Sequence, residues 1–81
     1  MADENDGRQA ADLVEFIAKA IVDDQEAVNV TAQDGGKLLE LETAPDDRGR
    51  VIGRQGRVAK AMRAVLAASG PGANSRLDIV D

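Results

Sequence analysis

The chain has 81 residues, of which 31% are charged and 43% hydrophobic, and its formal net charge is −5. This length provides one small domain with one core and excludes a multidomain enzyme. The absence of cysteine and histidine excludes disulfides, thiolate zinc sites, cysteine nucleophiles and histidine general bases. No signal peptide or membrane-spanning stretch is recognisable, so we expect a soluble, cytoplasmic protein without membrane insertion.

The charge is distributed unevenly along the chain. Residues 1–47 contain thirteen acidic and three basic residues, whereas residues 48–76 contain seven basic residues and no acidic one. Such a basic segment in an acidic protein indicates a local positive field that suits an anionic ligand. The alternative is that these bases only balance the acidic half across the fold.

The first helix is predicted to begin after Asp6, because Asp6 and Gln9 have the spacing of a capping box. Residues 1–6 are expected to form a disordered acidic tail, and residues 7–81 the domain. The two acidic residues at positions 23 and 24 oppose the helix dipole and predict the end of the helix. Phe16, the one aromatic residue, falls at the edge of the core-facing stripe. That stripe consists of Ala10, Leu13, Val14, Ile17, Ala20 and Ile21.

Two alternating segments predict a β-hairpin. Residues 27–33 and 37–43 alternate apolar and polar positions, and Asp34-Gly35-Gly36 supplies the turn. In the second segment the glutamates share one face, which makes that face acidic and disfavours phosphate binding there. Leu39 and Leu41 share the other face and are expected to be core residues.

Two helices and a last strand complete the pattern. Asp46 or Asp47 is expected to cap a short helix that runs through Ile52. A second helix is predicted over residues 57–69, and a strand over residues 75–80. The predicted core stripe of the second helix is Val58, Met62, Val65 and Leu66. The order helix, strand, strand, helix, helix, strand indicates an α+β fold.

A four-residue turn with glycine at both ends, Gly53-Arg54-Gln55-Gly56, separates the two helices; we call it the GxxG turn. The glycines allow a sharp bend and the close approach of another backbone. The start of the second helix offers unpaired N–H groups and the positive end of its dipole to a phosphate. Arg54 and Arg57 add formal charge. Taken alone, such a turn is more often only a tight helical connection.

Residues 51–57 resemble the Val/Ile-Ile-Gly-x-x-Gly signature of KH domains, and the longer run of residues 45–61 resembles the KhpA family of small bacterial single-KH-domain proteins. The resemblance implies a type II KH fold, with a three-stranded sheet and three helices packed on one face. It also implies that the turn clamps about four nucleotides of single-stranded RNA. The RNA-binding residues on this reading are Val51, Ile52, Gly53, Arg54, Gln55, Gly56, Arg57 and Lys60.

The same resemblance implies an RNA chaperone or post-transcriptional regulator linked to cell-envelope growth and cell shape. It further implies self-association into a homodimer and pairing with a larger KhpB-like KH protein. The alternative is a protein-interaction module that forms homo- or heterodimers through the same basic helical hairpin. The sequence does not separate RNA from single-stranded DNA as the ligand.

Catalysis has little support in the sequence. The serines and threonines have no histidine or cysteine partner, and the turn lacks the spacing and the Gly-Lys-Ser/Thr ending of a P-loop. Asp46 and Asp47 precede a predicted helix, where capping is a more common role than Mg²⁺ binding. We therefore expect no enzymatic activity, no metal and no cofactor.

Overall fold

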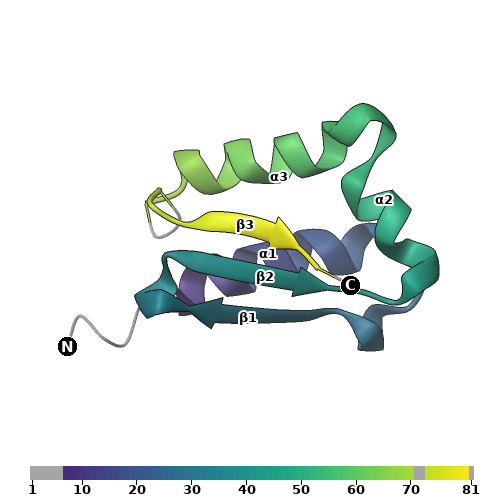
Figure 1. Cartoon of the computed structure of the whole chain (residues 1–81), viewed down its shortest axis with the longest axis horizontal. Coiled ribbons are helices and arrows are strands. Elements are labelled where there is room, and N and C mark those ends of the chain that lie inside the picture. Colours follow the sequence, from purple (N-terminus) through teal and green to yellow (C-terminus); the bar gives the residue numbers. More distant parts are fainter. Residues whose placement is uncertain (1–6, 71–72, 81) are drawn as a thin grey trace.

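The elements of the chain follow one another in the predicted order. A computed structural model describes residues 7–70 and 73–80. Its helices and strands are α1 (Arg8–Ile21), β1 (Asn29–Gln33), β2 (Leu38–Glu42), α2 (Arg48–Ile52), α3 (Arg57–Ala68) and β3 (Arg76–Ile79). This order confirms the α+β class and is consistent with a KH domain (Figure 1).

The sheet has β2 in its centre. β1 and β2 form the predicted hairpin and pair antiparallel from Asn29↔Glu42 to Gln33↔Leu38. β3 pairs parallel to the other edge of β2, from Leu38↔Arg76 to Leu41↔Ile79. A parallel pair needs a crossover connection, and α2 and α3 supply it. The hairpin turn and the α2–α3 junction consequently lie at opposite ends of the molecule (Figure 1).

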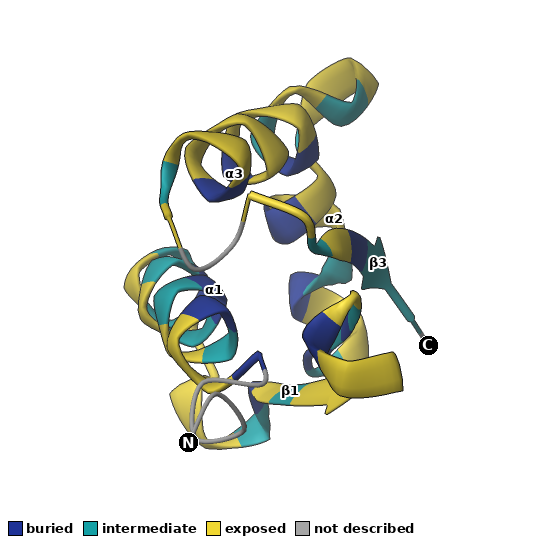
Figure 2. Ribbon diagram, turned by 90° about the vertical axis from the view of Figure 1, so that its left-hand side faces the viewer, coloured by how far each residue is buried: buried dark blue, intermediate teal, exposed yellow. Residues whose placement is uncertain are grey.

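The helices gather on one side of the sheet, and α2 lies at its end (Figures 1 and 2). The buried segments of the helices and strands face one another across the interior (Figure 2). Leu39 and Leu41 have no exposed surface, which confirms their predicted core position. The largest fully buried side chains are Leu39, Leu41, Met62, Leu66, Leu77, Val14 and Val51. Helices and strands thus contribute to one core.

Two predicted core positions are wrong, because Ala20 on α1 is exposed and Val65 on α3 is 45% exposed. Phe16, which was expected at the edge of the α1 stripe, is 74% exposed. On α1 the buried face is centred on Val14 and Ala18, each two residues and about 200° around the helix from Phe16. On α3 the buried residues are Ala59, Met62 and Leu66, which turns Val65 toward the outer margin.

Two predicted boundaries also change. β1 begins at Asn29, because residues 25–27 form a 3-10 turn in place of the expected start of the strand. Asp6, the expected helix cap, and the rest of the predicted tail lie outside the described residues. Gly7 occupies the N-cap position of α1, with a φ of 82° and no side-chain cap hydrogen bond. Within the described ranges, no helix is long and apolar enough to cross a membrane.

Asp47 stands at the N-cap position of α2 but does not cap that helix through its side chain. Its carboxylate accepts hydrogen bonds from the backbone N–H groups of Asp24, at 3.0 Å, and Asp23, at 3.2 Å. Arg50 Nε lies 3.8 Å from the same carboxylate. The Asp47 residue is buried, with 3% of its surface exposed. It therefore ties the connection after α1 to the start of α2.

These contacts make the carboxylate a contributor to stability that depends on pH. The N–H groups of Asp24 and Asp23, and to a smaller extent the charge of Arg50, hold the pKa of the Asp47 carboxyl below its ordinary value of 3.8, against the opposing effect of burial. A lowered pKa in the folded state means that the contribution is fully present above the ordinary pKa. It is lost as the pH falls through the lower, folded-state pKa.

We expect Asp47→Asn to lower the melting temperature by several degrees at pH 7, because the amide cannot accept both backbone hydrogen bonds with a full negative charge. The difference from the wild-type chain should shrink as the pH falls below about 4, because Asp47 takes up a proton there in the unfolded chain and only at lower pH in the folded chain. Thermal unfolding followed by circular dichroism at several pH values measures both effects. Asp46→Asn, at the exposed neighbouring position, is the control and should melt as the wild type does. Equal melting temperatures for both variants at pH 7 would contradict the assignment.

Candidate functional site

The two helices of the crossover are separate, and the GxxG turn lies between them. α2 ends at Ile52, and Gly53 has a φ of 78° and a ψ of 168°, outside the helical region. The Gly56 N–H donates to the Gly53 carbonyl over 3.0 Å and closes a single 3-10 turn, after which α3 begins at Arg57. The turn is therefore a defined structure at the N-terminus of α3.

Gly53 is required for two reasons. Its φ of 78° lies in a region that residues with a side chain rarely adopt. A Cβ at this position would also lie 2.5 Å from Val58 Cγ2 and 2.7 Å from the Val58 backbone nitrogen. Gly56 differs, since a Cβ there would meet nothing within 4 Å and only its φ of 76° favours glycine. The close approach of the two helices thus depends on Gly53, whereas Gly56 serves the local backbone conformation.

The two residues between the glycines face outward. Arg54 and Gln55 are both exposed. Gln55 has a φ of 58°, a left-handed conformation that costs a non-glycine residue about 1 kcal/mol or more. Backbone strain of this kind is concentrated at functional sites, and here it occurs at a residue that contributes nothing to the core.

The positive charge is concentrated at this turn more narrowly than the sequence suggests. Several basic residues of segment 48–76 bind within the fold: Arg50 pairs with Asp23, Arg63 donates to the Leu77 carbonyl, and Arg76 pairs with Asp78. Arg54, Arg57 and Lys60 are exposed, and none of them has a side-chain hydrogen bond or an ion pair with any residue of 7–70 or 73–80. These three cations are available to an anion.

The remaining predicted site residues differ in exposure. Ile52 is 37% exposed beside the turn, whereas Val51 has no exposed surface. The expectation that Val51 lines the binding surface therefore needs correction. Its side chain points from the short helix α2 into the core, where it holds the helix and hence the turn in place.

Arg63 is a surface residue near this site that the motif did not indicate. It is exposed on α3, and its Nε and Nη2 groups donate to the Leu77 carbonyl oxygen of β3 at 3.1 and 3.0 Å. The sequence spacing could have indicated it. Arg63 follows Lys60 by three residues and Arg57 by six, so the three basic residues form a line along α3, which we call the basic line.

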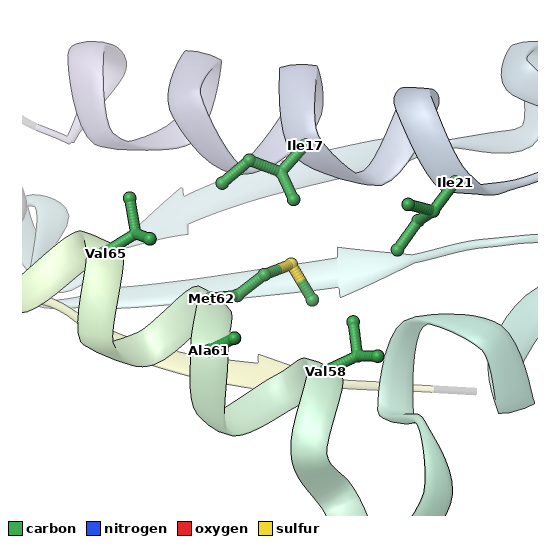
Figure 3. A pocket seen from close by; sticks show the side chains of 6 residues that line it. All are labelled: Ile17, Ile21, Val58, Ala61, Met62 and Val65. Carbon is green, nitrogen blue, oxygen red and sulfur yellow. The ribbon is translucent and has the colours of Figure 1, made fainter.

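An apolar groove lies between α1 and α3. It encloses about 240 Å³. Figure 3 shows the side chains from the two helices pointing toward one another across it. The lining residues are Ile17, Ile21, Val58, Ala61, Met62 and Val65. The groove lies on a different flank of α3 from Arg63, which is about 140° around the helix from Val58. In the described part of the chain, no cluster of three His, Cys, Asp or Glu residues could hold a metal ion.

Comparison with known proteins identifies the family. A profile of the KH domain of KhpA/KhpB matches residues 11–80. A protein from Halalkalibacterium halodurans named RNA-binding protein KhpA is 49% identical over 73 residues, which cover 85% of this chain and 96% of the relative. Proteins with the same name from Clostridium acetobutylicum and Leifsonia xyli are 46% and 42% identical, over 80% and 88% of this chain and 89% and 96% of the relatives. No solved structure matches the chain. The fold, the turn and these relatives together show that the chain belongs to the KhpA/KhpB family of KH-domain proteins.

Proposed function

We propose that the chain is a non-enzymatic RNA-binding protein that holds about four nucleotides of a single strand at the GxxG turn. The observation that carries the proposal is the exposed, glycine-bracketed turn with three cations, Arg54, Arg57 and Lys60, that have no partner in the described part of the chain. The name RNA-binding protein KhpA of the relatives supports the same ligand.

The proposed grip is on the sugar–phosphate backbone. The first N–H groups of α3 and the positive end of its dipole favour a phosphate at the turn. Arg54, Gln55 and Arg57 supply further donors around it, and the exposed aliphatic Ile52 offers an apolar contact to a base. Phe16, the one aromatic residue, belongs to α1 and not to the GxxG turn, so aromatic stacking is not the proposed mode.

We propose a role as an RNA chaperone or post-transcriptional regulator in the cytoplasm. A module that contacts about four nucleotides, mainly through their backbone, binds weakly and with little sequence selectivity. Such binding suits a protein that acts on many transcripts and releases them readily.

Replacement of Arg54 and Gln55, the two exposed residues of the GxxG turn, tests whether this turn holds the RNA. We expect Arg54→Asp combined with Gln55→Asp to weaken binding to a short single-stranded RNA by at least about tenfold, because each aspartate repels the phosphates. Fluorescence anisotropy measures the affinity, and thermal unfolding verifies that the variant is folded.

The matched control is Gln9→Asp combined with Lys37→Asp, which changes the net charge equally at exposed positions near the hairpin end of the molecule. It should retain most of the affinity. A folded turn variant that binds as well as the wild type would remove the turn from the site.

The salt dependence of binding tests how many cations take part. If Arg54, Arg57 and Lys60 each neutralise one phosphate, log K should fall with log[salt] with a slope of about −2, at roughly 0.7 per contact on a single strand. Lys60→Gln should make this slope shallower by about 0.7, the contribution of one phosphate contact. A slope near zero would show that the ligand is not held through its phosphates.

The apolar groove favours a second, compatible function, self-association. Its lining is entirely apolar, and Val65 is 45% exposed at its margin. We propose that the groove contacts a second copy of the chain, so that α3, part of the predicted basic hairpin, forms the interface. Two linked turns would raise the affinity for one RNA strand through effective concentration. A larger KhpB-like protein is the other partner that the family implies.

A charge at the margin of the groove tests self-association. We expect the mass of the wild-type chain in light scattering to rise with concentration toward that of a dimer, and Val65→Glu to remain monomeric, because the interface would bury the carboxylate. Ala67→Glu places the same charge on an exposed part of α3 outside the groove and is the control. A wild-type chain that stays monomeric at all concentrations would exclude the homodimer.

A further inference from the structure

Arg63 holds a fixed position on the outer edge of the sheet. On its inner edge, β3 faces β2: the Arg76 N–H donates to the carbonyl of Lys37, and the Val80 N–H donates to the carbonyl of Leu41. Because alternate residues of a parallel strand direct their backbone groups to opposite sides, the Leu77 carbonyl points away from β2. The guanidinium of Arg63 binds that carbonyl through Nε and Nη2 at 3.1 and 3.0 Å. Two bonds to one oxygen define both the place and the plane of the cation.

The binding leaves one side of the guanidinium open. A guanidinium has five N–H donors. When Nε and Nη2 share one acceptor, the two terminal nitrogens still present one parallel N–H each at the end of the group, and Arg63 is an exposed residue. This fork matches two neighbouring acceptors in one plane. A carbonyl oxygen has no negative charge, so the formal charge of Arg63 is not neutralised by Leu77.

The distance from the GxxG turn places Arg63 within reach of a bound strand. Arg63 lies seven positions after Gly56, which corresponds to about 10 Å along α3. A strand of about four nucleotides extends over about 14 Å even at the short spacing of 3.4 Å per nucleotide. Lys60 lies between them at helical spacing from both Arg57 and Arg63. A strand held at the turn and directed along this basic line therefore passes Arg63.

We propose that Arg63 is a base-reading residue and selects guanine in an RNA strand held at the GxxG turn. This inference rests on the proposed RNA-binding function and adds to its backbone grip a preference at one nucleotide. Guanine is the base whose O6 and N7 accept the paired donors of an arginine in one plane. The contact with Leu77 removes the conformational freedom that a long side chain otherwise loses on binding, so the fork is positioned before the ligand arrives.

The test compares short oligouridine strands with and without one central guanosine, together with a strand that carries 7-deazaguanosine, which lacks the N7 acceptor. We expect the wild-type chain to bind the guanosine strand about tenfold more tightly than oligouridine. The 7-deaza strand should lose most of this gain. Arg63→Lys keeps the charge without the fork and should bind all three strands within about twofold of one another.

Arg76→Lys is the matched control, because Arg76 is an exposed arginine of β3 that pairs with Asp78. It should keep the guanosine preference, and thermal unfolding verifies that both variants are folded. The inference is overturned if the wild type shows no guanosine preference or if Arg63→Lys retains it. It is also overturned if Arg63→Lys weakens the binding of all strands by the same factor, because loss of a phosphate contact would have that effect. A wild-type chain that binds none of the strands would overturn the proposed function as well.

Discussion

The contact between the backbone at Gly53 and the side chain of Val58 determines how α2 and α3 meet. A Cβ at residue 53 would lie within 2.8 Å of three Val58 atoms, so the chain can bend this tightly only at a glycine. The bend lets Val51 and Met62 enter the same core. It also leaves Arg54 and Gln55 on the surface. The packing of the domain and the exposure of the candidate site therefore have one cause.

Features that depend on neighbours in the sequence could be predicted, and those that depend on distant partners could not. The alternation around Leu39 and Leu41 indicated the hairpin, and the GxxG spacing indicated the break between the helices. Asp47 was expected to cap its own helix, but its hydrogen-bond donors belong to residues 23 and 24, more than twenty positions away. The contact of Arg63 with Leu77 joins two elements whose approach no local pattern describes.

Helical periodicity predicted apolar stripes but not which edge of each stripe is covered. Val65 lies at such an edge, beside the groove between α1 and α3, whereas Phe16 lies on the side of α1 opposite its buried residues. The net charge of −5 also did not indicate which ligand the protein binds. Acidic residues neutralise Arg50 and Arg76 at structural positions, and the cations at the GxxG turn have no such partners in the described ranges. The location of the charges, and not their sum, decides which surface attracts an anion.

The parallel pairing of β3 with β2 has a consequence for biosynthesis. β3 follows the crossover in the sequence, and it supplies Leu77, which is buried in the core. While the ribosome is still translating the crossover, one edge of β2 has no neighbouring strand and the core lacks that leucine. Pairing between such distant segments forms late in folding. The nascent chain therefore exposes an open strand edge, to which chaperones or other nascent chains can bind, until translation has reached β3.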